Sequence, residues 1–219
     1  MSKVFDAVAA PLDVEPEAVR AAVALLSPSE RQRASRFSFE RDRRRFIVAR
    51  ARLRQLLAAR LEIQPEEVDL VYGSHGKPAL TDSDLHFNVS HCDDLAVYAF
   101  SWGHEIGVDV EAVRWFVDAG DIAARFFSRR ENVAYAALDP LDKPLGFFNC
   151  WTRKEAFIKA LGDGLNHPLD SFDVSLAPNE PAKILRVENR PGECCGWSME
   201  TFVPMPGFVA AVVTENHDQ

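Results

Sequence analysis

Two acidic side chains share one face of a short predicted strand near the middle of the chain. Residues 106–111 alternate apolar and polar types, so Gly107, Asp109 and Glu111 face the same way. Two carboxylates this close repel each other unless a cation lies between them. Hard oxygen ligands in this number suit Mg²⁺, which takes one or two carboxylates and completes its shell with water and phosphate oxygens. For this segment alone, a solvent-exposed polar strand face is the alternative.

A second group of reactive side chains lies on a predicted helix. Trp151, Glu155 and Lys159 are four residues apart and therefore share one helix face. Trp151 on this face indicates that it is at least partly buried, and a partly buried acid or lysine usually has a partner. A third metal carboxylate and a phosphate-binding lysine fit this pattern, and a surface Glu–Lys pair is the alternative.

Two shorter motifs carry polar groups that could bind phosphate. Ser90 and His91 end a predicted strand, where they bind an anion or cap a turn. They are not a hydrolase dyad, because neighbouring strand residues point to opposite faces. The segment 76–78, Gly-Lys-Pro, offers a cation in a rigid loop, with an ordinary surface turn as the alternative. The sequence contains no P-loop, nucleophile elbow or dinucleotide fingerprint.

The elements that position these groups follow from apolar spacing and turn residues. A capping residue followed by proline at Ser27-Pro28 predicts a helix start. Apolar residues at helical spacing predict a long amphipathic helix over 41–61 and a second one over 144–161, with shorter helices over 117–127 and 131–138. Strands are predicted over 68–72, 86–90, 95–100 and 106–111, and an antiparallel meander over 172–176, 182–187, 197–203 and 207–214.

The composition is that of an ordinary globular chain. The 219 residues are 47% hydrophobic and 26% charged, which excludes a fibre or a disordered chain. The longest apolar runs are strand-sized and too short for a membrane helix, which needs about 20 residues. The beginning of the chain has no apolar signal core, so a cytoplasmic location is expected. The four cysteines show no metal-like spacing and are expected to be reduced thiols.

The net charge of −8 conceals a strong local imbalance. Residues 31–60 contain eleven arginines and only two acids, a charge of +9, so the rest of the chain carries −17. Like charges in one short stretch repel each other, and an anion bound there relieves that repulsion. An arginine-rich helix face paired with acids elsewhere in the fold is the alternative.

A faint internal repeat indicates two similar halves. Phe37-Ser38, a long helix and then residues 87–90 are echoed by Phe127-Ser128, a long helix and then residues 172–175. We therefore predict an α/β (α+β) fold of two pseudo-repeated halves, 1–103 and 104–219. Each half is expected to pack a long helix on a small, mostly antiparallel sheet, with the active site in the cleft between them.

In this order the motifs resemble those of the two-domain 4'-phosphopantetheinyl transferases that activate surfactin synthetase and related megasynthases. Each motif alone is weak, but the set is specific. The matching segments are 76–78, 87–91, 106–111, Phe126-Phe127-Ser128 with Glu131, 151–156 with Lys159, and 162–165.

The resemblance implies transfer of the phosphopantetheine arm of coenzyme A to a serine of an acyl or peptidyl carrier protein, with release of 3',5'-ADP. It implies Mg²⁺ or Mn²⁺ held by Asp109, Glu111 and Glu155. Glu155 is the first choice as general base and Glu131 the second, and Lys159 neutralises charge during catalysis. The residues expected to bind coenzyme A are Arg41, Arg50, Gly76, Lys77, Pro78, Ser90, His91, Lys154 and Lys159. Glu30 stands where a relative can have a basic phosphate-binding residue, with Arg31 and Arg33 as the nearest substitutes.

Two other functions are weighed against this one. Another Mg²⁺-dependent transferase or hydrolase acting on a nucleotide pyrophosphate would share the acids and cations without needing a carrier protein. A non-catalytic protein could bind a polyanion such as RNA with its arginine helix, but clustered carboxylates near the anion site argue against this. We expect a monomer without nucleic-acid or membrane partners.

Overall fold

The structure is a computed structural model that describes residues 5–73, 76–162, 167–188 and 193–216. Residues 163–165 of the predicted motif 162–165 lie outside these ranges. Within the described ranges, no helix is both long enough and apolar enough to cross a membrane.

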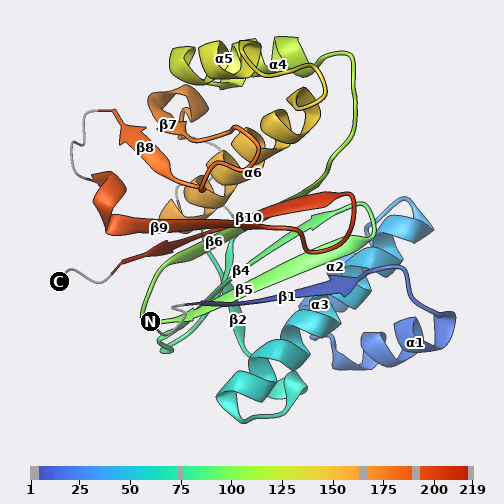
Figure 1. The fold of residues 1–219 in the computed structure, drawn as a ribbon. Helices are drawn as coiled ribbons and strands as arrows, with labels where there is room; N and C mark the ends of the chain where they lie inside the picture. Colours follow the sequence, from blue (N-terminus) through green and yellow to red (C-terminus); the bar gives the residue numbers. More distant parts are fainter. Residues whose placement is uncertain (1–4, 74–75, 163–166, 189–192, 217–219) are drawn as a thin grey trace.

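The chain consists of two halves with the same order of elements. Within the described ranges, each half has a strand, three α-helices and four further strands, and the third α-helix of each is the longest (Figure 1). The first half contains β1 (Phe5–Pro11), α1 (Pro16–Leu25), α2 (Pro28–Ala34), α3 (Glu40–Leu61), β2 (Leu70–Tyr72), β3 (Pro78–Leu80), β4 (Leu85–Cys92) and β5 (Leu95–Trp102). The second contains β6 (Ile106–Ala112), α4 (Ala119–Phe126), α5 (Arg129–Ala136), α6 (Lys143–Leu161), β7 (Phe172–Val174), β8 (Ile184–Val187), β9 (Trp197–Phe202) and β10 (Phe208–Glu215).

The sheets repeat in the same way. The first half forms an antiparallel sheet in the order β1-β5-β4, and the second forms one in the equivalent order β6-β10-β9. Each half adds a two-stranded sheet, β2-β3 and β7-β8. The predicted fold class is confirmed. The predicted C-terminal meander is wrong in one respect, because β7 and β8 pair with each other while β9 and β10 extend the sheet that begins with β6.

The two main sheets pack against each other between the two long helices. Helix α3 covers one sheet through Leu53 and Leu57, and α6 covers the other through Ala156 and Ala160. A third apolar cluster joins the inner faces of the two sheets and contains Phe5, Leu95, Val97, Ala99, Ile106, Val108, Val110, Ala210 and Val212. Four layers result (Figure 1). The interface between the halves is therefore largely filled by side chains.

The long helices agree with their sequence signals. Helix α3 ends at Leu61, and Glu62 then takes a left-handed conformation with φ of 57°. Helix α6 ends in the same way at Gly162, with φ of 76°, a position that glycine occupies without steric cost. The predictions over 41–61 and 144–161 are confirmed to within one residue. Strand β1 and helix α1 were not predicted.

The internal repeat is real, but its structural register differs from the predicted one. Helices α2 and α5 both begin with a capping box, in which serine and glutamate side chains accept hydrogen bonds from each other's backbone N–H groups. Glu30 accepts from Ser27 N at 2.8 Å, and Glu131 accepts from Ser128 N at 2.7 Å. Ser128 is therefore the counterpart of Ser27.

Each capping-box glutamate also binds a buried cation on the long helix that follows. Glu30 accepts from Arg54 Nε at 2.7 Å, and Glu131 lies 2.9 Å from Lys154 Nζ. Both cations also donate to carbonyl oxygens of the chain beyond the helix: Arg54 to Pro65 and Val68, and Lys154 to Leu169 and Phe172. We call each set a hub: Ser27, Glu30 and Arg54 in the first half, and Ser128, Glu131 and Lys154 in the second. Each hub ties a short helix, a long helix and the following segment together.

Candidate active site

The two main sheets meet along a polar seam between their edge strands, β4 and β6. The two strands are joined by side chains, and alternate residues of β4 supply them. The contacts are Val108 N donating to Asn88 Oδ1 at 3.0 Å, Ser90 Oγ donating to Asp109 Oδ1 at 2.8 Å, and Cys92 Sγ donating to Glu111 Oε2 at 3.2 Å. The strand alternation predicted for residues 106–111 thus places Asp109 and Glu111 at the boundary of the two halves.

Helix α6 is brought onto this seam by Gly107. A Cβ atom at this position would lie 2.1 Å from the carbonyl oxygen of Ala156 and 2.4 Å from the nitrogen of Ala160. The absence of a side chain therefore lets the helix backbone contact the strand directly. Because the contacting residues Ala156 and Ala160 directly follow Glu155 and Lys159, the contact sets the height of these two side chains relative to β6.

Lys159 and Asp109 are in direct contact. The ammonium group donates to Asp109 Oδ1 at 2.6 Å, to Ser90 Oγ at 3.1 Å and to the Val108 carbonyl oxygen at 3.2 Å. The other carboxylate oxygen of Asp109, Oδ2, is buried and has no hydrogen-bond partner among the described residues. One oxygen of Asp109 is thus held by a cation, and the other is available for a ligand.

The surroundings of Glu155 and Glu111 disfavour the charged form of both carboxylates. Burial raises the pKa of Glu155 above its usual value, and the negative charges of Asp109 and Glu111 raise it further. Burial likewise raises the pKa of Glu111, with a further contribution from Asp109. Cys92 donates its S–H to Glu111, and burial raises its own pKa to about 11, so the thiol stays protonated at neutral pH.

These acids fit a divalent hard cation but do not already form its cage. No group of three or more carboxylate, imidazole or thiol side chains in the described part of the chain is arranged to hold a metal ion. Asp109 Oδ2 accepts no hydrogen bond from the described residues, and the pKa values of Glu111 and Glu155 are raised, so a divalent cation at this place would stabilise all three carboxylates. Asp109, Glu111 and Glu155 therefore have the donor chemistry for Mg²⁺, with water completing the shell.

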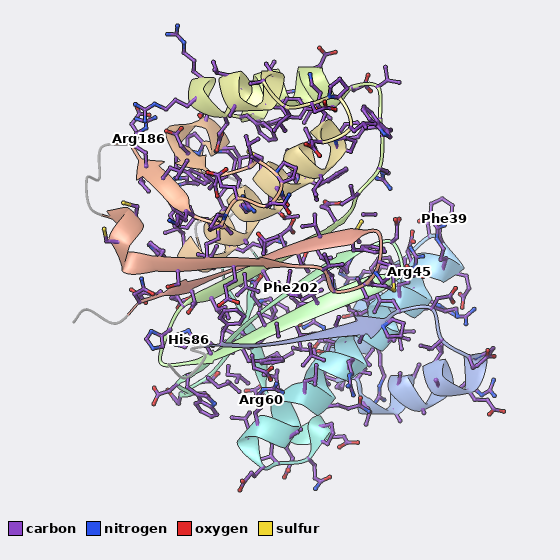
Figure 2. The ribbon with its side chains drawn as sticks, in the orientation of Figure 1. Phe39, Arg45, Arg60, His86, Arg186 and Phe202 are labelled. Carbon is purple, nitrogen blue, oxygen red and sulfur yellow. The ribbon has the colours of Figure 1, made fainter. Side chains whose placement is uncertain are left out.

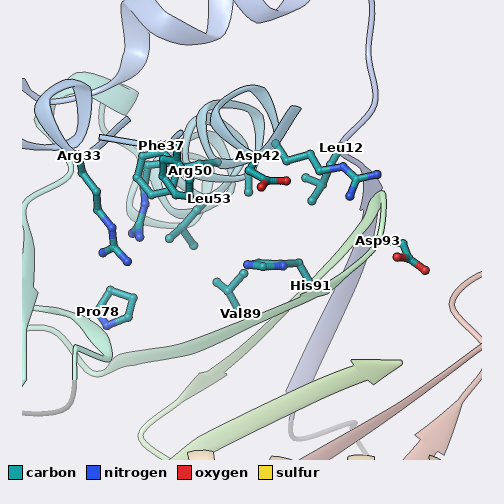
Figure 3. Close-up of a pocket in the computed structure, with 13 residues that line it drawn as sticks. Leu12, Arg33, Phe37, Asp42, Arg50, Leu53, Pro78, Val89, His91 and Asp93 are labelled. Atoms are coloured by element: carbon teal, nitrogen blue, oxygen red, sulfur yellow. The ribbon is translucent and has the colours of Figure 1, made fainter. Parts of the chain in front are cut away.

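A cavity of about 560 Å³ lies in the first half beside this seam (Figure 3). Arg33 and Arg50 extend into it from the helical wall, and His91 stands on β4 at the other side. Both arginines lie near the ring of Phe46, with Arg33 Cζ 5.4 Å and Arg50 Cζ 5.8 Å from its centroid. Cations on an aromatic floor suit a ligand that combines phosphate with a flat ring.

His91 connects the cavity to the acids. It lines the cavity with Arg45, and burial lowers its pKa below 6.5, as do the positive charges of Lys159 and Arg45. The imidazole is therefore neutral at neutral pH in the free protein. Two further donors at the cavity, Arg45 Nε and Arg50 Nη1, are buried without a hydrogen-bond partner within the described ranges. An anion bound in the cavity would satisfy them.

The structure gives different surroundings to the three residues of the Gly-Lys-Pro motif. Pro78 lines the large cavity. Gly76 forms a tight turn with φ of 77°, closed by its N–H donating to the Gly73 carbonyl oxygen at 2.9 Å. The Lys77 ammonium is engaged within the protein, where it donates to the carbonyl oxygen of Lys159 at 2.8 Å and to Glu105 Oε2 at 3.3 Å.

Lys77 thus fastens the motif to the last turn of α6, where a cation is favoured by the helix dipole. Glu105 also accepts from His86, whose Nδ1 lies 3.1 Å from Glu105 Oε1. In Figure 2, His86 and Arg45 lie on opposite sides of the view. The contacts of Glu105 with Lys77 and His86 therefore fasten the end of the seam that is distant from Arg45.

Three predicted site residues are not brought together with the rest. Lys154 and Glu131 are 1% and 2% exposed, and their charged groups satisfy each other and the backbone in the second hub. Both residues are therefore used within the fold and do not reach the seam or the large cavity, where their predicted roles in cofactor binding and in catalysis would place them. Arg41 lies on the exposed first turn of α3 beside Asp42, and Arg45, one turn later, lines the cavity in its place.

A second cavity, of about 440 Å³, adjoins Glu155 on the side of the second half. Its wall combines apolar side chains such as Trp151, Phe126 and Ile158 with the polar side chains of Arg125, His167 and Asp170. Trp151 contacts Phe126 edge to face, with the ring centroids 5.9 Å apart. The predicted shared face of Trp151, Glu155 and Lys159 is therefore used on both sides: Lys159 meets the seam, and Trp151 meets this cavity.

The arginine-rich stretch serves two purposes. Arg33, Arg45 and Arg50 line the large cavity, whereas Arg54 lies in the first hub and Arg43 and Arg60 pair with acids. Arg45 and Phe46 line this cavity but were not predicted as site residues. A signal was present, because the cavity-lining positions 42, 45, 46, 49, 50 and 53 recur at helical spacing on one face of α3.

The seam brings together carboxylates and a lysine, and the cavity beside it adds several guanidinium groups. Such a set of side chains is typical of an enzyme that transfers a phosphate-containing group. Family comparison agrees with that class. Residues 105–213 match the 4'-phosphopantetheinyl transferase superfamily model, and residues 13–102 match the model of the N-terminal part of a 4'-phosphopantetheinyl transferase.

Individual relatives lead to the same family. The chain is 39% identical over 206 residues to the 4'-phosphopantetheinyl transferase HetI of Nostoc sp., covering 92% of this chain and 84% of that protein. It is 29% identical over 197 residues to the 4'-phosphopantetheinyl transferase Sfp of Bacillus subtilis, covering 90% and 85%. The chain belongs to the 4'-phosphopantetheinyl transferase family. Among solved structures, the holo-[acyl-carrier-protein] synthase of Thermotoga maritima is 22% identical with a TM-score of 0.41 over 52% of this chain and 64% of that one, a likeness too low to argue from.

Proposed function

We propose that this protein transfers the 4'-phosphopantetheine arm of coenzyme A to a serine hydroxyl of an acyl or peptidyl carrier protein and releases 3',5'-ADP. The observation that carries this proposal is the Asp109 carboxylate, with one oxygen held by Lys159 and the other free, next to an arginine-lined cavity. This arrangement supports the reaction because a pyrophosphate needs a cation site and positive side chains side by side.

The first half, residues 1–103, would bind the nucleotide end of coenzyme A. Arg33, Arg45 and Arg50 supply positive charge, and Phe46 supplies a ring face. The cavity volume of about 560 Å³ is within the range of small-molecule sites. Ser90 lies at the seam and His91 lines the cavity, so we propose that both contact phosphate oxygens.

The second half, residues 104–219, would provide the metal ligands and the catalytic helix. Asp109, Glu111 and Glu155 would hold Mg²⁺ or Mn²⁺, which would supply charge neutralisation at the pyrophosphate oxygens. Lys159 adds a second positive charge at the same place. Val110 offers no side-chain oxygen, so water would have to complete the coordination shell.

In the proposed reaction, the one proton transfer is assigned to a side chain of the protein itself. The serine oxygen of the carrier attacks the phosphorus that bears pantetheine, its proton passes to a carboxylate, and the bond to the 3',5'-ADP oxygen breaks. Glu155 is the proposed general base, because it lines the second cavity next to the acids of the seam, whereas Glu131 is buried in the second hub. The cavity beside Glu155 offers both apolar and polar side chains, which suits the uncharged, amide-containing part of the pantetheine arm.

The remaining partner assignments belong to the same proposal. The substrate is an acidic carrier protein, the enzyme works as a monomer in the cytoplasm, and nucleic acid and membranes are not partners. The arginine-rich rim of the cavity would favour an acidic surface through long-range attraction.

Mass spectrometry tests the proposal directly. The chain is incubated with coenzyme A, Mg²⁺ and an apo carrier protein, and the carrier is expected to gain the mass of one phosphopantetheine arm. EDTA should suppress the gain, and so should Asp109→Ala. No mass change with any of several acyl and peptidyl carriers would refute the proposal. Uptake of the arm that is insensitive to EDTA would refute the metal site.

A further inference from the structure

The two hubs are built alike, yet their glutamates use their second carboxylate oxygen differently. In the second hub, Glu131 Oε1 accepts from Val174 N at 2.8 Å, so both of its oxygens are bound. In the first hub, Glu30 Oε2 accepts from both Ser27 N and Arg54 Nε. The other oxygen, Glu30 Oε1, is buried and has no hydrogen-bond partner in the described ranges.

The unpartnered oxygen of Glu30 faces an arginine of the large cavity. Glu30 Oε1 lies 3.6 Å from Arg50 Nε, and the two side chains are only 3% and 12% exposed. Arg50 also lies over Phe46 and Tyr72, each at 5.8 Å from the ring centroid. A carboxylate behind it and two rings beside it thus fix the Arg50 guanidinium, whose Nη1 has no hydrogen-bond partner among the described residues.

We infer that Glu30 is a positioning residue for coenzyme A binding: it holds Arg50 at the cavity wall and balances the charge of Arg50 and Arg54 until the anion arrives. This inference rests on the proposed function, because it concerns the same cavity. The geometry thus gives this acid a part in phosphate binding through its neighbour Arg50.

A neutral replacement separates this role from simple support of the fold. In Glu30→Gln, the amide oxygen replaces Oε2, which receives both hydrogen bonds, and the NH₂ group then points at Arg50. A donor facing a guanidinium displaces it from the wall. We expect the Kd of coenzyme A to rise roughly fivefold to tenfold, as for the loss of one charge-assisted contact, with kcat at saturating coenzyme A unchanged.

A double-mutant cycle with Arg50→Gln provides the decisive measurement, with coenzyme A as the titrant in calorimetry. If Glu30 acts through Arg50, adding Glu30→Gln to Arg50→Gln weakens binding no further. Glu131→Gln is the matched control from the second hub: it should lower Tm and leave the Kd of coenzyme A unchanged. Should Glu30→Gln not fold, Glu30→Asp enters the same cycle, because the shorter side chain cannot reach both Arg54 and Arg50.

Two results would overturn the inference. One is a Glu30 variant that binds coenzyme A as tightly as the unaltered chain, and the other is an equal loss of affinity with and without Arg50. An unaltered chain that binds no coenzyme A would be a different failure, because it would contradict the proposed function itself and with it the role of Glu30.

Discussion

Replacing Gly107 with alanine should inactivate the enzyme, because it displaces helix α6 by about 0.9 Å. The added Cβ would lie 2.1 Å from the Ala156 carbonyl oxygen and 2.4 Å from the Ala160 nitrogen, whereas real Cβ contacts essentially never fall below 3.0 Å. Helix α6 must therefore retreat from β6 by about 0.9 Å, because both obstacles are backbone atoms that cannot rotate away.

The retreat has a cost in stability and a larger cost in catalysis. Overpacking of this kind lowers the free energy of unfolding by about 1–3 kcal/mol, and for a chain of this size each 1 kcal/mol lowers Tm by about 2–4 °C. The 2.6 Å contact between Lys159 and Asp109 opens by a similar distance as the helix moves. A misplacement of about 1 Å costs on the order of 100-fold in rate, so we expect kcat/KM to fall about that much while the protein remains folded.

The assay combines calorimetric unfolding with a time course of carrier modification. Gly120→Ala is the control, because a Cβ at Gly120 on α4 would meet nothing within 4 Å in the described structure and alanine favours a helix. This control should be neutral or slightly more stable, with unchanged activity. A Gly107→Ala protein with the Tm and kcat/KM of the unaltered chain would refute the argument that the close contact of α6 and β6 sets the site geometry.

Three further perturbations test other contacts. Asp109→Asn should abolish the rise in Tm that Mg²⁺ produces and lower transfer at least about 100-fold, and a Tm rise equal to that of the unaltered chain would exclude Asp109 as a ligand. Burial and nearby cations lower the pKa of His91 in the free protein, whereas a bound phosphate raises it. Coenzyme A should therefore bind with uptake of a proton near pH 6.5, and its affinity should increase as the pH falls toward that value. Calorimetry in two buffers of different ionisation enthalpy measures this uptake, and zero uptake would contradict it. Lys77→Met should raise the KM for coenzyme A and lower kcat together, because the substitution releases the cavity wall at Pro78 from the helix that carries Lys159. If neither constant changed, the contact of Lys77 with α6 would be dispensable.

The sequence predicted those parts of the site that local periodicity encodes. Alternation in β6 placed Asp109 and Glu111 on one face, and helical spacing placed Glu155 and Lys159 on another. Which cation pairs with which acid depends on contacts between distant segments, and no local pattern contains this information. Lys154 and Lys159 are both lysines of α6, yet one is buried in a hub and the other reaches the seam.

The register of the repeat was missed for a related reason. The predicted match relied on phenylalanine followed by serine, a pair that recurs by chance. The structural match relies on serine followed three residues later by glutamate, and on a buried cation 24 residues after Glu30 and 23 after Glu131. The cation is arginine in one half and lysine in the other, so identity of residues does not reveal it.

The apolar layer between the two sheets means that neither half is a self-sufficient unit. Phe5 and Val97 on one side and Val108 and Val212 on the other bury one another, and all four are at most 7% exposed. A chain cut after Trp102 would expose this layer and leave two unprotected edge strands, which are ready templates for association with other chains. Each fragment should therefore be recovered as aggregate when produced alone and as soluble protein when the two are produced together. The duplicated architecture therefore corresponds to a dimer within one chain, whose two halves cannot separate without exposing their shared apolar layer.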